Sequence, residues 1–233
     1  MTDVQLVDDV AGAAAERIAA AVRAGGHIAL SGGSTPRAAH ERVAQAELDW
    51  SQATLWFGDD RAVPPDHEHS NYAMAKASLL DRIGGPQPEV HRIRGELGYE
   101  GAARVYEQEL HDVFGGHSLP PLDLVLLGLG PDAHCASLFP GDAALGERAR
   151  WVVGVETPGM PPLVSRVTFT LPVLNAARDV VFLISGEDKA DAVARAFGDA
   201  PHPDAPASLV RPTEGGLIVL LDPPAAARLG DPR

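Results

Sequence analysis

The chain has 233 residues, of which 45% are hydrophobic, and a net charge of −13 at neutral pH. The length and the hydrophobic fraction fit a single globular domain, 1–233. The negative charge argues against non-specific nucleic-acid binding, which needs a basic face. Its one cysteine, Cys135, excludes an internal disulfide and a cysteine-based zinc site. No stretch has the length and apolarity of a membrane span and the N-terminus lacks a secretion signal, so we expect a cytoplasmic protein without membrane or nucleic-acid partners.

Helix and strand patterns alternate along the first half of the chain. Apolar residues at helical spacing predict a first helix, with Asp8 or Asp9 as its N-cap and two glycines at its end. Ser70 is in the position of an N-cap for a later helix, whose apolar face contains Met74 and Ala77. The predicted elements are helix 9–24, strand 27–30, a helix from Pro36 to about Ala46 with Thr35 as N-cap, strand 54–57, helix 71–80, strand 90–93 and helix 99–114.

The second half continues the alternation. Residues 122–127 form an apolar run typical of a buried parallel strand, whereas residues 166–171 alternate as a half-buried strand does. The predicted elements are strands 122–127, 151–155 and 166–171, a short helix from Pro172, strand 179–184, a helix ending near Phe197 and strand 217–221. Strands that alternate with helices predict an α/β fold in which a mostly parallel sheet has helices on both faces.

The loop 31–36 (SGGSTP) joins a predicted strand to a predicted helix. Gly32 and Gly33 permit a close backbone approach, and Ser34 and Thr35 carry hydroxyl groups that form hydrogen bonds. The N–H groups at a helix N-terminus and the helix dipole attract anions, so this loop is a candidate phosphate site. An ordinary capped turn is the alternative, and the spacing of a Walker loop is absent.

The segment 128–141 (GLGPDAHCASLFPG) follows the predicted strand 122–127 and contains Asp132 and His134. An imidazole takes up a proton near neutral pH, so His134 is a candidate general base, with Asp132 to orient it or the substrate. A loop histidine that satisfies backbone groups is the alternative. Cys135 and Ser137 are poor candidate nucleophiles for this histidine, because catalytic partners normally come from distant positions of a chain.

Charged side chains follow two other predicted strands. Arg61 has the geometry to bind a phosphate through two hydrogen bonds, and the alternative is that it braces its loop by pairing with Asp59 or Asp60. Lys189 ends the turn that follows strand 179–184. The segment 66–69 (DHEH) is more typical of a solvated loop than of a metal site, because consecutive residues rarely converge on one ion.

The carboxyl ends of parallel strands share one edge of a sheet, so we expect the polar strand ends to converge in one crevice. A crevice with one imidazole, one nearby carboxylate and several anion-binding groups suits general-base chemistry on a phosphorylated small molecule.

Four segments, spread over nearly the whole chain, resemble sequence blocks of the 6-phosphogluconolactonase family in the same order. They are 31–36 (SGGSTP), 57–61 (FGDDR) with 63–65 (VPP) and 70–71 (SN) after it, 128–140 (GLGPDAHCASLFP) and 166–175 (RVTFTLPVLN). The chain departs from the family pattern at Asp60, where Glu is usual, at Ala133, where Gly is usual, and at Cys135, where Thr is usual. Ala133 implies a turn that avoids a glycine-only conformation.

The resemblance implies a Rossmann-like domain that hydrolyses 6-phospho-D-glucono-1,5-lactone to 6-phospho-D-gluconate, in the oxidative pentose phosphate pathway and without a metal or cofactor. It implies that His134 is the general base that activates water, and that Asp132 helps to place the water, the imidazole or the sugar hydroxyls. A sugar-phosphate lactone is the expected ligand, and a monomer or weak homodimer the expected state. The substrate-binding residues implied are Gly32, Gly33, Ser34, Thr35, Asp59, Arg61, Arg166 and Lys189.

Two alternative functions belong to other classes. An amino-sugar-phosphate deaminase or isomerase of related fold is expected to carry Asn-Gly-His where this chain has Asp132-Ala133-His134. A non-enzymatic sugar-phosphate-sensing domain normally accompanies a DNA-binding helix-turn-helix and a basic N-terminus, which this sequence does not show.

Overall fold

The structure is a computed structural model that describes residues 2–116, 118–198 and 200–230. Within these residues, the main sheet has seven strands, and each neighbouring pair is parallel. In spatial order they are β1 (Thr2–Leu6), β10 (Gly216–Leu221), β9 (Asp179–Ile184), β6 (Leu124–Leu127), β2 (His27–Leu30), β3 (Thr54–Phe57) and β5 (Glu89–Val90). The chain winds outward in one direction from β2 and in the other from β6, so the strand order reverses between these two central strands.

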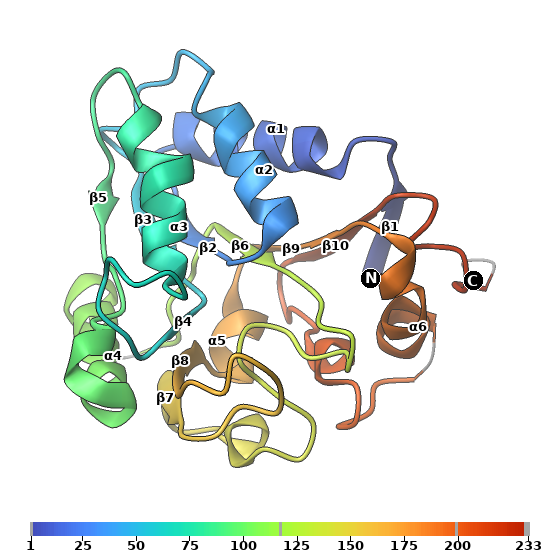
Figure 1. The fold of residues 1–233 in the computed structure, drawn as a ribbon. Coiled ribbons are helices and arrows are strands. Elements are labelled where there is room, and N and C mark those ends of the chain that lie inside the picture. The colour runs from blue at the N-terminus through green and yellow to red at the C-terminus, as the bar shows by residue number, and fades with distance from the viewer. Residues whose placement is uncertain (1, 117, 199, 231–233) are drawn as a thin grey trace.

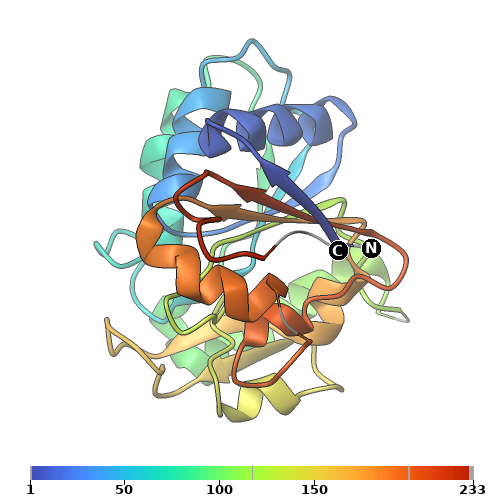
Figure 2. The same cartoon turned by 90° about the vertical axis from the view of Figure 1, so that its right-hand side faces the viewer.

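Helices cover both faces of the main sheet. Figure 1 shows α1, α2 and α3 above the sheet and α4, α5 and α6 below it, and Figure 2 shows the same layers from the side. The bounds are α1 (Val10–Arg23), α2 (Ser34–Val43), α3 (Asn71–Ser78), α4 (Gly98–Phe114), α5 (Leu171–Ala176) and α6 (Ala190–Val193). Short 3-10 turns cover Leu80–Arg82, Gly95–Leu97, Ala143–Gly146, Glu187–Lys189 and Pro206–Leu209, and Ala194–Gly198 form a π turn. The predicted α/β fold is therefore confirmed.

The described chain also forms a second, antiparallel sheet of three strands, β4 (Asp59–Arg61), β8 (Arg166–Phe169) and β7 (Val152–Val155). The expected loop at Asp59–Arg61 is therefore a strand, because it pairs with β8. The expected half-buried alternation in β8 is also wrong, since all four of its residues are buried. Tyr106 of α4 stacks on Phe169 of this strand, and the N–H of Ser137 donates to Oγ1 of the adjacent Thr168, so elements pack on both faces of the strand.

The helix ends differ from the sequence prediction in detail. Asp9 and Ser70 are N-caps as predicted, and each accepts a hydrogen bond from an N–H group three residues on. Helix α2 begins at Ser34, with Gly33 and not Thr35 in the N-cap position, because Gly33 makes the turn out of β2 with a φ of 111°. The same helix stops at Val43, three residues before the predicted end, where the last turn tightens to i→i−3 hydrogen bonds.

The buried stripe of α3 and the bounds of β5 both differ from the sequence prediction. In α3 the buried stripe is Asn71, Ala75 and Ser78, so Ala77 is exposed and Met74 lies at the margin of the stripe. The predicted strand 90–93 is wrong except at Val90: the strand found here is β5, Glu89–Val90, because only these two residues pair with β3.

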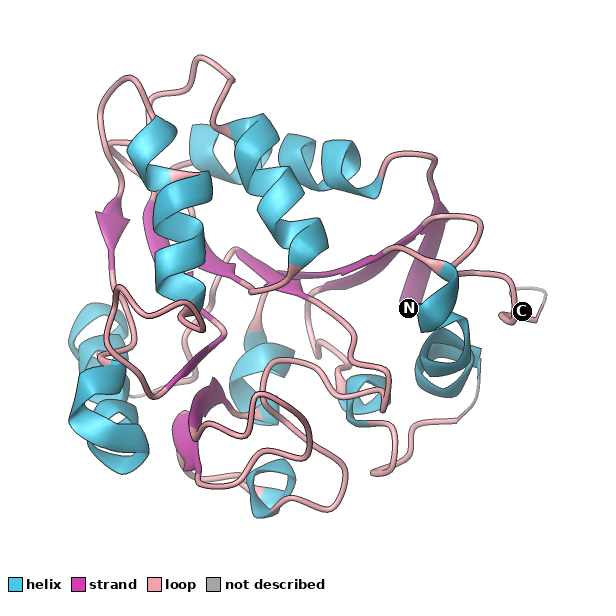
Figure 3. Cartoon of the chain, viewed as in Figure 1, coloured by secondary structure: helices cyan, strands magenta, loops and turns pink. Residues whose placement is uncertain are grey.

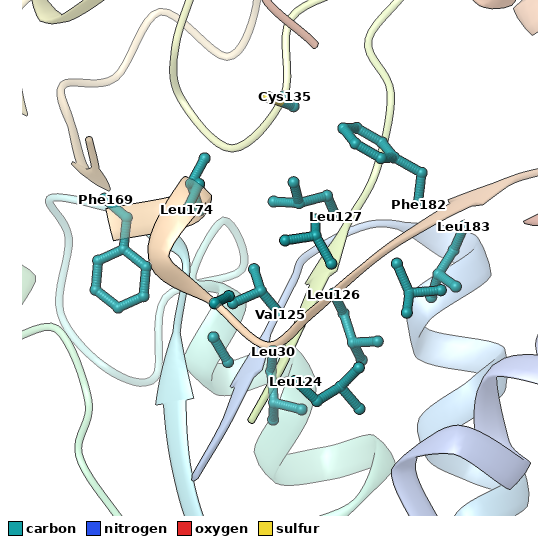
Figure 4. Packing of buried hydrophobic residues seen from close by; sticks show 14 of the residues in the cluster. Leu30, Leu124, Val125, Leu126, Leu127, Cys135, Phe169, Leu174, Phe182 and Leu183 are labelled. Atoms are coloured by element: carbon teal, nitrogen blue, oxygen red, sulfur yellow. The ribbon is translucent and has the colours of Figure 1, made fainter. Parts of the chain in front are cut away.

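The core lies on both sides of the main sheet. Leu124 and Leu126 of β6 point to one face, and Val125 and Leu127 point to the other, the face on which Leu174 of α5 lies (Figure 4). All four side chains are buried, as expected for a central parallel strand. None of the helices in the described chain combines the length and the apolar composition needed to cross a bilayer.

Candidate active site

A cavity of about 410 Å³ opens beyond the carboxyl ends of β2, β6 and β9, where the strand order of the main sheet reverses. Its walls include loops from both sheets, and Figure 3 shows the long loops on either side of β7 and β8. The expected convergence of polar strand ends is seen here. The predicted site residues that line the cavity are Gly32, Gly33, Ser34, Thr35, Asp59, Arg61, His134, Arg166 and Lys189.

His134 lies at the cavity wall, and Asp132 lies behind it. Nδ1 of His134 is 2.5 Å from Oδ1 of Asp132, and the backbone N–H of His134 donates to the same oxygen at 3.1 Å. Burial raises the pKa of Asp132, but the side-chain hydrogen bond with His134, its charge and its backbone N–H outweigh that effect, so the pKa lies below its ordinary value. The ionised carboxylate accepts the proton on Nδ1, which leaves Nε2 with the lone pair of a base.

A closed turn sets the position of this pair. The N–H of Gly130 donates to the carbonyl of His134, and the N–H of Ala133 donates to the carbonyl of Gly130, both at 2.9 Å. Ala133 has a φ of 65°, so the expectation that it avoids a glycine-only conformation is wrong. Its carbonyl accepts a hydrogen bond from Ala207, and its methyl group is fully buried; these contacts hold a left-handed conformation that costs about 1 kcal/mol in an L-residue.

The structure excludes the two nucleophiles that follow His134 in the sequence. The hydroxyl of Ser137 is buried and donates to Oδ2 of Asp59 at 2.6 Å, so it is not directed at His134. Cys135 is buried, and burial, followed by the charge of Asp59, raises the pKa of its thiol. A buried thiol with a raised pKa carries little thiolate and reacts poorly.

Two arginines lie side by side on neighbouring strands of the small sheet, at the cavity. Arg61 of β4 and Arg166 of β8 are register partners. Nη1 of Arg61 donates to the carbonyl of His69 and to Oδ1 of Asn71, each at 2.8 Å, so the alternative in which its side chain pairs with Asp59 or Asp60 is wrong. The fixed guanidinium therefore contributes a positive charge to the cavity wall.

The guanidinium of Arg166 is buried and is held by a loop between β7 and β8. It donates from Nε to the carbonyl of Val164 at 3.2 Å and from Nη2 to that of Pro162 at 3.1 Å. Burial and then the charge of Arg61 lower its pKa, but an arginine stays protonated. Its Cζ lies 5.7 Å from the ring centre of Phe139, whose ring is 4.5 Å from that of His134. Phe139 therefore connects the positions of the base and the cation.

The loop 31–36 and Lys189 complete the cavity wall. The N-terminus of α2 has no side-chain cap, so the N–H groups of its first turn are open to a ligand in the cavity. Lys189 follows β9 in a 3-10 turn, and its Nζ lies 3.6 Å from Oδ2 of Asp188. In the described ranges, no three His, Cys, Asp or Glu side chains lie close enough together to form a metal site.

Asn71 and Phe139 are site residues that their sequence context alone does not identify. Asn71 follows an N-cap and belongs by pattern to a helix start, whereas its amide contacts Arg61. Phe139 resembles an ordinary core aromatic and is 1% exposed, but its ring lies 4.5 Å from that of His134. The sequence signal for both is their place in segments that resemble family blocks, 70–71 and 128–140, and that signal assigns neither residue a role.

The chain is similar to known proteins over most of its length. A family model described as glucosamine-6-phosphate isomerases/6-phosphogluconolactonase matches residues 1–219. A 6-phosphogluconolactonase from Nostoc sp. is 41% identical over 208 residues, which cover 87% of this chain and 84% of that protein. One from Homo sapiens is 46% identical over 177 residues, which cover 76% of this chain and 67% of that protein. The solved structure of 6-phosphogluconolactonase from Trypanosoma cruzi has a TM-score of 0.87 at 29% identity and covers 98% of this chain and 97% of that one.

Proposed function

Since the chain belongs to the family of glucosamine-6-phosphate isomerases and 6-phosphogluconolactonases, we propose that it hydrolyses 6-phospho-D-glucono-1,5-lactone to 6-phospho-D-gluconate in the oxidative pentose phosphate pathway. The observation that carries the proposal is the His134–Asp132 pair, which presents the free Nε2 of an imidazole at a cavity with three basic side chains. The proposal includes a single domain, a cytoplasmic location and a monomer or weak homodimer, with no metal or cofactor.

His134 acts as the general base. Its Nε2 takes a proton from water as the water oxygen forms a bond to the lactone carbonyl carbon, and the carbonyl electrons move onto its oxygen. When the tetrahedral intermediate collapses, the bond from this carbon to the ring oxygen breaks, and the imidazolium returns the proton to that oxygen. The carboxylate of Asp132, 2.5 Å from Nδ1, stabilises the imidazolium that exists between these two steps.

The basic groups divide into two sets in this proposal. Arg61, Lys189 and the first turn of α2 bind the phosphate, which positions the reactive ester before attack. Arg166 lies beside Phe139 on the side of His134, where a cation stabilises the oxyanion of the intermediate. Arg166 would stabilise a charge that develops only in the transition state, and such an interaction raises kcat rather than tightening the binding of the substrate.

The test uses freshly prepared 6-phosphogluconolactone and measures hydrolysis above the spontaneous rate. We expect acceleration by the wild-type protein and a loss of about 10²–10⁴-fold in kcat for His134→Gln. Non-phosphorylated gluconolactone is the matched substrate, and its kcat/KM should be lower by at least about 100-fold, because it lacks the group that the basic residues bind. No acceleration, or equal rates for wild type and His134→Gln, would refute the proposal.

A further inference from the structure

Asn71 lies at the start of α3, and its side chain connects three parts of the cavity wall. The residue is 3% exposed, and its backbone N–H donates to Oδ1 of Asp60 at 2.6 Å, which fixes the main chain at this point. The helix start therefore fixes the position of the Cα from which the side-chain amide extends. It reaches β4 and the loop after β2.

The amide oxygen contacts the cation that the proposed function assigns to the phosphate. Oδ1 of Asn71 accepts from Nη1 of Arg61 at 2.8 Å, and the carbonyl of His69 shares the same nitrogen. Nε of Arg61 is buried without a partner in the described chain, so the two contacts at Nη1 are what orient the guanidinium. An arginine side chain is long and flexible, and its hydrogen bonds decide which way the planar group faces.

The amide nitrogen of Asn71 contacts Asp59, the first residue of β4. Nδ2 of Asn71 donates to the carbonyl of Asp59 at 2.9 Å and to its Oδ1 at 3.3 Å. Oδ2 of Asp59 is used separately, since it accepts from the hydroxyl of Ser137. Loss of the Asn71 side chain therefore leaves Asp59 bound to the segment that carries His134.

The amide also restricts the loop 31–36. A Cβ on Gly32 would lie 2.0 Å from Oδ1 of Asn71 and 2.6 Å from its Cγ, which no real contact allows. The phosphate loop and the amide therefore touch directly. Arg61 and the loop 31–36 both contact the amide of Asn71. One side chain therefore sets the distance between two of the groups proposed to bind the phosphate.

We propose that Asn71 is a positioning residue that holds the guanidinium of Arg61 against the phosphate of the substrate. The inference rests on the proposed function. An amide suits the position because it accepts from Arg61 and donates to Asp59 at the same time. An aspartate here would still accept from Arg61 but would place a second carboxylate beside Asp59.

The test compares Asn71→Ala with Ser70→Ala. We expect Asn71→Ala to raise KM for the phosphorylated lactone by at least about tenfold, which corresponds to the loss of one hydrogen bond to a charged group, with kcat changed less than about threefold. Its kcat/KM for non-phosphorylated gluconolactone should match wild type. Ser70→Ala removes the N-cap of α3 and the hydrogen bond from its hydroxyl to Asp60, but no contact of the Arg61 side chain. It therefore controls for a weakened helix start and should keep the wild-type KM.

Two further variants separate positioning from general damage. Once Arg61 is replaced by Ala, adding Asn71→Ala should raise KM by much less than tenfold, because the guanidinium that it positions is absent. An unchanged KM in Asn71→Ala or an additive effect in the double variant would overturn the inference. A wild-type protein that fails to accelerate lactone hydrolysis would instead refute the proposed function.

Discussion

The imidazole of His134 occupies the space that a side chain on residue 130 would need. A Cβ on Gly130 would lie 2.0 Å from Nδ1 and 2.1 Å from Cε1 of His134, and 2.8 Å from Oδ1 of Asp132. The glycine is needed here for room and not for backbone freedom. The absence of one methyl group thus allows the base and its carboxylate partner to meet against the main chain.

Gly130→Ala should displace His134 and remove most of the activity. We expect kcat to fall by about 10²-fold or more, because the methyl group forces the ring away from Asp132 and from the water that it activates. The measurement is kcat for the phosphorylated lactone, with the melting temperature as a check on folding. Gly146→Ala is the control, since a Cβ there meets open space. A Gly130→Ala enzyme with wild-type kcat would show that the imidazole position is unimportant.

Asp132→Asn should lower the rate of hydrolysis. The pKa of Asp132 lies below its ordinary value, so the residue stays a carboxylate through the pH range of the assay and stabilises the imidazolium. Without that charge the imidazolium that forms during the reaction is less stable. The rate should fall by about 10²-fold, since an amide that donates to Nδ1 favours the wrong tautomer. Measurements of kcat for both proteins at one pH provide the check, and an unchanged kcat would contradict the role assigned to Asp132.

The parts of the fold that could be predicted from sequence are those that local patterns determine. The apolar run of β6 and the glycines after it locate a strand and the turn that carries His134. Asp9 and Ser70 locate two helix starts, because their side chains bond to N–H groups only three residues away. Such features depend on neighbours in the sequence and need no knowledge of the tertiary structure.

The features that could not be predicted depend on partners far along the chain. Asp59–Arg61 has little intrinsic preference for a strand, and its pairing with β8, about a hundred residues later, makes it one. The left-handed conformation of Ala133 is held in part by a hydrogen bond from Ala207. Asn71 becomes a site residue only when β4 brings Arg61 to it. Sequence patterns therefore located the charged loops but not the contacts between them.

Phe139→Leu should weaken catalysis more than its effect on stability explains. The ring lies 4.5 Å from His134 and 5.7 Å from Cζ of Arg166, so a smaller side chain frees both groups. We expect kcat/KM to fall by about tenfold or more, from the lost cation–π contact and the looser imidazole. The control is Phe169→Leu, because Phe169 is equally buried but stacks on Tyr106. Equal losses of kcat/KM in two variants of equal melting temperature would argue against a specific role for Phe139.

His40 should make the protein lose stability in acid. It is fully buried between α2 and α3, its Nε2 has no partner in the described chain, and Nδ1 is 3.3 Å from Oγ of Ser78. Burial lowers the pKa of His40 from 6.5 to about 4, while Glu41 works weakly in the other direction. Since the unfolded chain binds the proton more readily over this range, stability decreases as the pH falls from about 6.5 to 4, by about 3 kcal/mol in total.

The variant His40→Leu isolates this effect, because it removes the titrating group and keeps an apolar side chain of similar size. We expect its free energy of unfolding to rise relative to wild type as the pH falls from 7 to 4. Asp60, whose pKa burial raises to about 6, acts in the opposite direction, since its folded form binds the proton more readily, but it is present in both proteins and cancels in the difference. Urea unfolding at several pH values measures the difference, and a difference that is constant between pH 7 and 4 would show that His40 does not resist protonation in the folded protein.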